Sequence, residues 1–302
     1  MDLDELTSLL DLGIWDQLTP LTCEEIAHNI VEYLPSSFQF LRVETYASGK
    51  QSHHIALFEY DTSSEQSTFA LISGGKATLG YNPTNHSFVP PEALMKKWQE
   101  DGGYFYSGDF YGSTSINYDM LHEYLTQKSV PSMVISNYNV LYAHLENVML
   151  PLREVTIQPF LLEVEAKTHS REPLLHSVIT SKLAKQGFRF ASLDEWEYAC
   201  DAGSHTFFHW GNDIPENMTS LMLPTRPNGF GLFIANNPYN WEFCADPRFM
   251  RGGDGGYAAC GGSGILAEFL PLASAYVHQL SEEEITKGVY GVHIRRAYSF
   301  LE

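Results

Sequence analysis

Residues 187–199 read GFRFASLDEWEYA and form the most patterned stretch of the chain. Ser192 stands three residues before Glu195, which is the spacing of a capping box, where each side chain bonds the backbone amide of the other. The sequence therefore predicts a short helix that begins after Ser192. The capping role explains Glu195 and exposure to solvent would explain Glu197, so we interpret both carboxylates as structural rather than catalytic.

Outward from this segment, the N-terminal part of the chain changes from a helical to an extended pattern. Ile26, Ile30 and Leu34 recur every four residues and predict a helix with one buried face. Thr22 and Glu25 have the spacing of its capping box. Segments rich in aromatic and β-branched residues predict strands at 38–46, 54–60, 68–72 and 153–163, the first three as an antiparallel meander. Two more helices are predicted at 92–100 and 117–128.

The C-terminal third of the chain is rich in turn-forming residues. From residue 203 onward Gly, Asn, Pro and aromatic residues dominate, which indicates an α+β fold with little regular secondary structure. The densest turn-like stretches are 227–233, 240–244 and 251–256. Glycine and asparagine tolerate left-handed backbone conformations, and the carbonyl groups of such loops can bind calcium. We interpret these stretches first as tight turns, which need no ligand.

The charge of the chain limits its partners. The 302 residues include 18 Lys and Arg against 37 Asp and Glu, which leaves a formal net charge of −19. Such a charge repels phosphate backbones and anionic lipid surfaces. We therefore expect no nucleic-acid or membrane partner, and a protein, peptide or small molecule instead.

The cysteines and the apolar segments indicate in which cellular compartment the protein is expected. Four scattered cysteines form neither a disulfide framework nor a CxxC zinc pair, which fits a reducing environment. Residues 1–5 are acidic where a secretory signal would be basic. The apolar run 264–280 contains Glu268, Pro271 and His278, which the hydrocarbon core of a membrane disfavours. A cytoplasmic protein without a membrane span is the expectation.

Eight segments, taken in order, carry a family resemblance. They are residues 69–80, 153–160, 189–199, 208–212, 228–232, 241–244, 251–253 and 291–295. Their order resembles that of the formylglycine-generating enzyme, or sulfatase-modifying factor, family. The resemblance covers residues 67–302 and implies a C-type-lectin-like fold. Residues 1–66 would then be an N-terminal extension of helices and a β-meander, and residues 81–150 an insertion in a connection that is usually short.

The resemblance also implies a metal site, but this chain lacks most of the family's metal-ligating residues. Aerobic members of the family hold copper(I) with two cysteines soon after the Arg-Gly-Gly turn, because soft Cu(I) favours thiolates. Those two places fall on Tyr257 and Gly262. Cys260 lies between them and could supply one ligand if the loop slipped, with Cys244 as the second. The asparagine turn that holds calcium in family members is also missing, so neither copper nor calcium has its expected ligands.

We therefore predict a divergent family member whose copper-oxidase site is incomplete and which acts as a binding or interaction module. The residues predicted to line its surface groove are Trp210, Asn228, Trp241, Glu242, Arg251, Asp254 and Tyr257. One alternative is a thiol- or metal-dependent oxidase of the formylglycine-generating type that uses Cys260, with Cys244 as a second catalytic candidate. Another is a carbohydrate-binding, lectin-like module that uses Trp210 and Trp241 as exposed aromatic surfaces.

Overall fold

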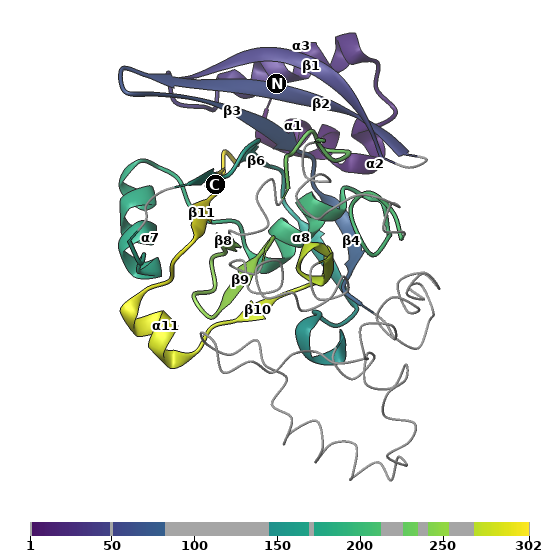
Figure 1. The fold of residues 1–302 in the computed structure, drawn as a ribbon. Helices are drawn as coiled ribbons and strands as arrows, with labels where there is room; N and C mark the ends of the chain where they lie inside the picture. Colours follow the sequence, from purple (N-terminus) through teal and green to yellow (C-terminus); the bar gives the residue numbers. More distant parts are fainter. Residues whose placement is uncertain are drawn as a thin grey trace.

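The computed structural model describes residues 2–48, 51–81, 145–168, 172–212, 226–234, 241–253 and 269–301. These residues form a mixed α+β fold with two five-stranded sheets and one two-stranded ribbon (Figure 1). Several predicted features lie outside the described residues: the helices at 92–100 and 117–128, most of the 81–150 insertion, and Asp254, Tyr257 and Cys260.

Three helices open the chain: α1 (Leu3–Leu9), α2 (Leu12–Trp15) and α3 (Pro20–Val31). The predicted capping box at Thr22 and Glu25 is wrong, because α3 begins earlier. Its N-cap is Thr19, whose side chain accepts a hydrogen bond from the amide of Thr22, and Pro20 fits the first turn, where its missing N–H is not needed. The predicted apolar face is present at Ile26 and Ile30, which are buried, but Leu34 lies beyond the end of α3 at Val31.

The first sheet has the order β1-β2-β3-β6-β12. Its strands are β1 (Phe38–Ser48), β2 (Gln51–Thr62), β3 (Glu65–Ile72), β6 (Phe160–Glu163) and β12 (Ala297–Tyr298). All four strand pairs are antiparallel, so the meander predicted for the first three strands is confirmed. Strands β1 to β3 form one side of this sheet, and β6 and β12 complete the other side. Helix α3 packs against β1 and β2 (Figure 1).

The single strand predicted at 153–163 is in fact two strands in different sheets. β5 (Arg153–Ile157) pairs with β4 (Gly75–Leu79) in the ribbon, whereas β6 joins the first sheet. The break is at Gln158 and Pro159, where proline has no N–H to donate to a strand partner. Gly74 allows the close approach at this point, because a Cβ there would lie 2.4 Å from the carbonyl oxygen of Ile157.

The second sheet has the order β10-β9-β8-β11-β7. Its strands are β10 (His278–Gln279), β9 (Phe249–Arg251), β8 (Trp241–Phe243), β11 (Val292–Ile294) and β7 (Lys167–Thr168). Most of its pairs are antiparallel, and β8 and β11 run parallel.

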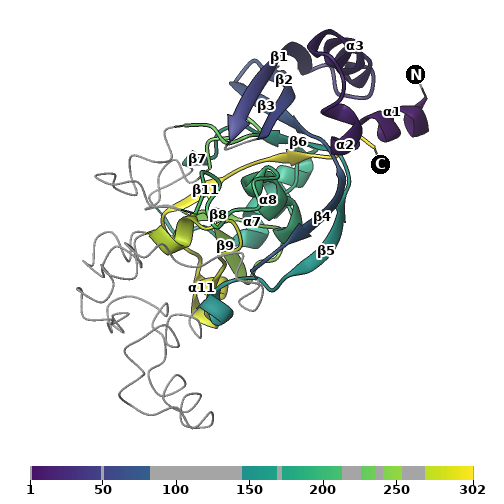
Figure 2. The ribbon, with the colours of Figure 1, turned by 90° about the vertical axis from the view of Figure 1, so that its right-hand side faces the viewer.

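Further helical elements are α7 (His176–Lys185), α8 (Leu193–Asp201), α11 (Glu282–Lys287) and the 3-10 turn η2 (Leu270–Leu272). Helix α8 lies in the middle of the molecule, packed against the β4–β5 ribbon (Figure 2). Among the described residues no helix combines the length and the apolar character needed to cross a membrane.

Candidate functional site

The start of α8 forms as the sequence predicts. The Ser192 hydroxyl accepts from the amide of Glu195 at 3.1 Å, and the Glu195 carboxylate accepts from the amide of Ser192 at 2.7 Å. The capping box is therefore confirmed. It fixes the first turn of α8 and directs the Glu195 carboxylate back along the chain toward Arg189.

Glu197 has a different environment from the one predicted. It is 2% exposed, so the expectation that it faces solvent is wrong. Its Oε2 accepts one hydrogen bond from Arg153 and one from Arg251, each at 3.0 Å. Arg251 is itself fully buried, and its guanidinium also donates to the carbonyl of Tyr276 at 2.7 Å. Glu197 faces inward because two guanidinium groups compensate its charge there.

Glu242 and Arg295 form a second buried ion pair. Arg295 donates two hydrogen bonds of 2.8 Å to the Glu242 carboxylate, and the indole N–H of Trp196 donates a third at 2.9 Å. Burial acts to raise the pKa of the Glu242 carboxyl, but the charge and hydrogen bonds of Arg295 outweigh it and lower that pKa. Glu242 therefore remains ionised and holds β8 against α8 and the segment after β11.

Asn228 and Trp241 are also buried supports. The Asn228 amide donates to the carbonyls of Ala199 and Cys200 at 2.7 and 3.0 Å, and so caps the end of α8. The indole of Trp241, 2% exposed, donates to the carbonyl of Tyr290 at 2.8 Å. Contrary to the prediction, Asn228 and Trp241, like Glu242 and Arg251, do not line an open groove. Trp210 is half-buried and stacks on Phe208, with ring centroids 4.6 Å apart.

The described cysteines are buried thiols. Burial raises the pKa of Cys244 to about 12 and that of Cys200 to about 12, and it raises the pKa of Cys23 to about 11. Such thiols stay protonated at neutral pH, whereas the thiolate is the nucleophile and the metal ligand. Cys244 is fully enclosed and so does not fit the role of a catalytic thiol or an accessible copper ligand. Within the described ranges, no cluster of three or more His, Cys, Asp and Glu side chains has the arrangement of a metal site.

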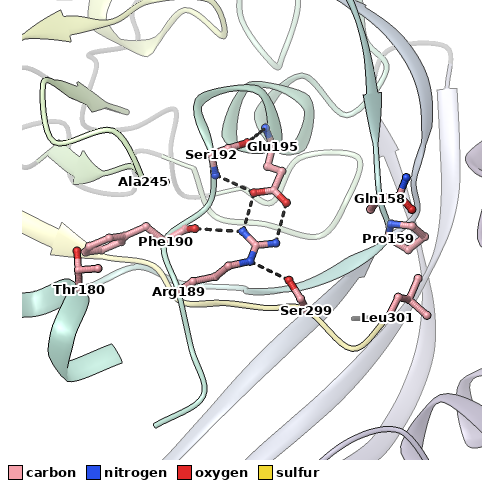
Figure 3. Close-up of a pocket in the computed structure, with 10 residues that line it drawn as sticks. All are labelled: Gln158, Pro159, Thr180, Arg189, Phe190, Ser192, Glu195, Ala245, Ser299 and Leu301. Atoms are coloured by element: carbon pink, nitrogen blue, oxygen red, sulfur yellow. Dashed lines mark hydrogen bonds and ion pairs between the residues drawn. The ribbon is translucent and has the colours of Figure 1, made fainter. Parts of the chain in front are cut away.

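A cavity of about 570 Å³ opens between the start of α8, helix α7 and the segment that follows β12 (Figure 3). Its lining comes from stretches far apart in the sequence. The residues are Gln158, Pro159, Thr180, Arg189, Phe190, Ser192, Glu195, Ala245, Ser299 and Leu301. We call it the Arg189 cavity.

The floor of the Arg189 cavity is an internally neutralised ion pair. Arg189 Nη1 and Nη2 each donate to one oxygen of the Glu195 carboxylate at 2.7 Å, as the dashed lines in Figure 3 show. Arg189 Nε donates to the Ser299 hydroxyl at 2.8 Å, and Nη1 also donates to the carbonyl of Phe190 at 3.1 Å. The two charges cancel, so the floor is polar without carrying a net charge.

The walls of the Arg189 cavity combine apolar and neutral polar groups. Pro159, Phe190, Ala245 and Leu301 supply apolar surface. The hydroxyls of Ser192, Thr180 and Ser299 and the amide of Gln158 supply hydrogen-bonding groups without charge. This mixture suits an uncharged ligand with one apolar side.

A second cavity, of about 170 Å³, adjoins the other end of α8 and includes Glu197, Asp201 and His205 in its lining. Its carboxylates already have partners. Asp201 accepts from the Ser204 hydroxyl at 2.8 Å and from the amide of His205 at 3.2 Å, and burial raises its pKa. These bonds end α8, so we assign this cavity a structural role.

Comparison of the chain with models of known protein families gives no match, and comparison with curated protein sequences gives none either. The family resemblance therefore depends on the order of the sequence motifs. The function has to be argued from the site itself.

Proposed function

We propose that this chain is a binding or interaction module, a divergent relative of the sulfatase-modifying factors with a C-type-lectin-like fold. Its ligand, a peptide or small molecule, would occupy the Arg189 cavity. The observation that carries this proposal is the cavity of about 570 Å³ with a neutral polar floor. Ligand sites in proteins commonly measure about 300 to 1,000 Å³ and combine apolar walls with a few polar groups.

The motif residues support a scaffold rather than a catalytic role. Glu197 and Glu242 are each paired with a buried arginine: the first pair joins α8 to β9, and the second joins β8 to the segment after β11. Neither carboxylate is open to a substrate, since both are 2% exposed. These paired acidic and basic residues thus hold the fold together.

Two alternative functions are supported by fewer residues. A formylglycine-generating type of oxidase would rely on Cys260, because the enclosed Cys244 thiol has a pKa of about 12. A lectin-like module would rely on Trp210, because Trp241 is buried. Neither alternative accounts for the Arg189 cavity.

A panel of small ligands tests the binding proposal. Capped dipeptides, monosaccharides and neutral aromatic compounds are titrated into the full chain and followed by ligand-observed NMR. The proposal predicts saturable binding of at least one class, weakened about tenfold or more in Ala245→Trp, which fills the cavity. The matched control is Val178→Trp, since Val178 is 58% exposed and lies on the side of α7 opposite the cavity residue Thr180. Absence of saturable binding, or equal binding by Ala245→Trp, would contradict the proposal.

A further inference from the structure

The Arg189 guanidinium offers a ligand only one kind of surface. Four of its five N–H groups already donate, to the Glu195 carboxylate, the Ser299 hydroxyl and the carbonyl of Phe190. These partners surround the edge of the planar group, as Figure 3 shows. One N–H of Nη2 remains for a single acceptor, but a carboxylate or phosphate that bound this edge with two oxygens would have to displace the Glu195 carboxylate. The edge is therefore closed to bidentate anions, and the flat faces remain.

An aromatic ring lies on one side of the guanidinium group. The central carbon of the guanidinium lies 5.6 Å from the centroid of the buried Phe160 ring, on the side of the first sheet. The Arg189 side chain is nevertheless 36% exposed, and it lines the cavity. With its edge largely occupied and Phe160 on one side, we take the open part of the group to be the side away from Phe160. Planar guanidinium groups stack on aromatic rings, and the attraction is stronger where water is excluded.

The surroundings of that face favour an uncharged ring. Phe190, Pro159 and Leu301 provide apolar surface in the same cavity. Glu195 cancels the arginine charge, and the net charge of −19 on the chain disfavours an anion. The Ser299 hydroxyl, which accepts from Arg189 Nε, keeps its own proton for an acceptor on the edge of the ring.

Building on the proposed function, we infer that the Arg189 cavity is a site for an uncharged aromatic ring that stacks on the open face of the Arg189 guanidinium. The ring can belong to a free small molecule or to the side chain of a tyrosine in a peptide. The two sources share the same chemistry at the floor of the cavity. They differ in whether flanking peptide groups add affinity.

Four probes, tested on the full chain, measure the preference for an aromatic ring and distinguish a small molecule from a peptide as its source. Phenol is compared with cyclohexanol, which has the same size and hydroxyl but no aromatic face, and with benzoate, which carries a negative charge. N-acetyl-tyrosinamide adds the peptide groups. The inference predicts that phenol binds about tenfold more tightly than cyclohexanol and benzoate, and that Ala245→Trp abolishes this preference while Val178→Trp keeps it. Tighter binding of N-acetyl-tyrosinamide than of phenol would assign the site to a peptide, and equal binding to a small molecule.

A substitution at the stacking group provides the second measurement. Arg189→Lys keeps the positive charge toward Glu195 but removes the flat face, so it should reduce the phenol preference about tenfold toward that of cyclohexanol. Far-UV circular dichroism checks that the variant is folded. Equal binding of phenol and cyclohexanol by the unmodified chain, or tighter binding of benzoate, would overturn the inference without any variant. If another ligand class binds in a manner sensitive to Ala245→Trp, the proposed function stands and only the aromatic assignment fails.

Discussion

Replacing Glu242 by glutamine tests the claim that the motif carboxylates hold the fold. The side chain keeps its size but loses its charge, which leaves the fully buried Arg295 guanidinium without the carboxylate that pairs with it. Glu242 accepts three hydrogen bonds of 2.8 to 2.9 Å, and a neutral amide oxygen can replace only part of them. Removing one partner of a buried pair costs about 3 to 5 kcal/mol. Urea unfolding at pH 7, followed by circular dichroism, should show a loss of that size.

The matched control is Glu283→Gln in α11. Glu283 pairs with Lys287 on the surface, where both side chains are more than 70% exposed, and such pairs contribute little to stability. The pH dependence gives a second readout. Because the pKa of Glu242 is lowered in the fold, its contribution is present above the ordinary value of 4.5 and is lost as the pH falls. Glu242→Gln should therefore flatten the acid limb of the stability curve. A loss below about 1 kcal/mol, or one equal to that of Glu283→Gln, would refute the reasoning.

Three further predictions concern acid sensitivity, backbone geometry and thiol reactivity. Burial lowers the pKa of His209 and of His278 to about 4. Between pH 6.5 and 4 the unfolded chain therefore binds more protons than the folded chain, so the free energy of unfolding should decrease as the pH falls from 6.5 to 4. The loss is up to about 3 kcal/mol per histidine, and His278→Gln should reduce the slope of urea midpoints against pH. Gly80→Ala should lower the melting temperature far more than Gly211→Ala; both glycines have positive φ, but only at Gly80 would a Cβ collide with backbone, at 2.0 Å. Cys244 should resist iodoacetamide at pH 8 in the native chain and react after unfolding, as peptide mass spectrometry would show.

Local signals in the sequence predicted local structure well. The capping box at Ser192 is confirmed because its two hydrogen bonds depend only on residues three apart. The meander is confirmed because aromatic and β-branched segments separated by short polar connections pair with their neighbours. Helix α3 was found with the right buried face, but its start was misplaced because Thr19 and Pro20 give a stronger N-terminal signal than Thr22.

The environment of the motif residues could not be predicted in the same way. Glu197 looks exposed in the sequence because the two arginines that neutralise it, Arg153 and Arg251, are distant along the chain. Trp241 looks like an exposed aromatic surface, but the tertiary fold buries it under β10, where the ring of His278 lies 4.5 Å away. Contacts between residues so far apart along the chain produce no periodic pattern in the sequence.

The Arg189 cavity was missed for a related reason. Its lining combines the break between β5 and β6, one residue of α7, the start of α8 and the segment after β12. Four of the lining residues, Arg189, Phe190, Ser192 and Glu195, belong to the patterned segment 187–199, but the other six do not. The six-residue spacing of the Arg189–Glu195 ion pair across a helix start could have suggested a local bridge, but not the cavity above it.

Copper analysis of the reconstituted chain tests the central claim, that this is a binding module and not a cysteine-dependent oxidase. The unmodified chain and Cys260→Ser are incubated anaerobically with Cu(I), freed of loose metal by a competing chelator, and assayed for copper per chain. The binding-module account predicts no retained copper that depends on Cys260. About one copper per unmodified chain, lost in Cys260→Ser, would contradict it.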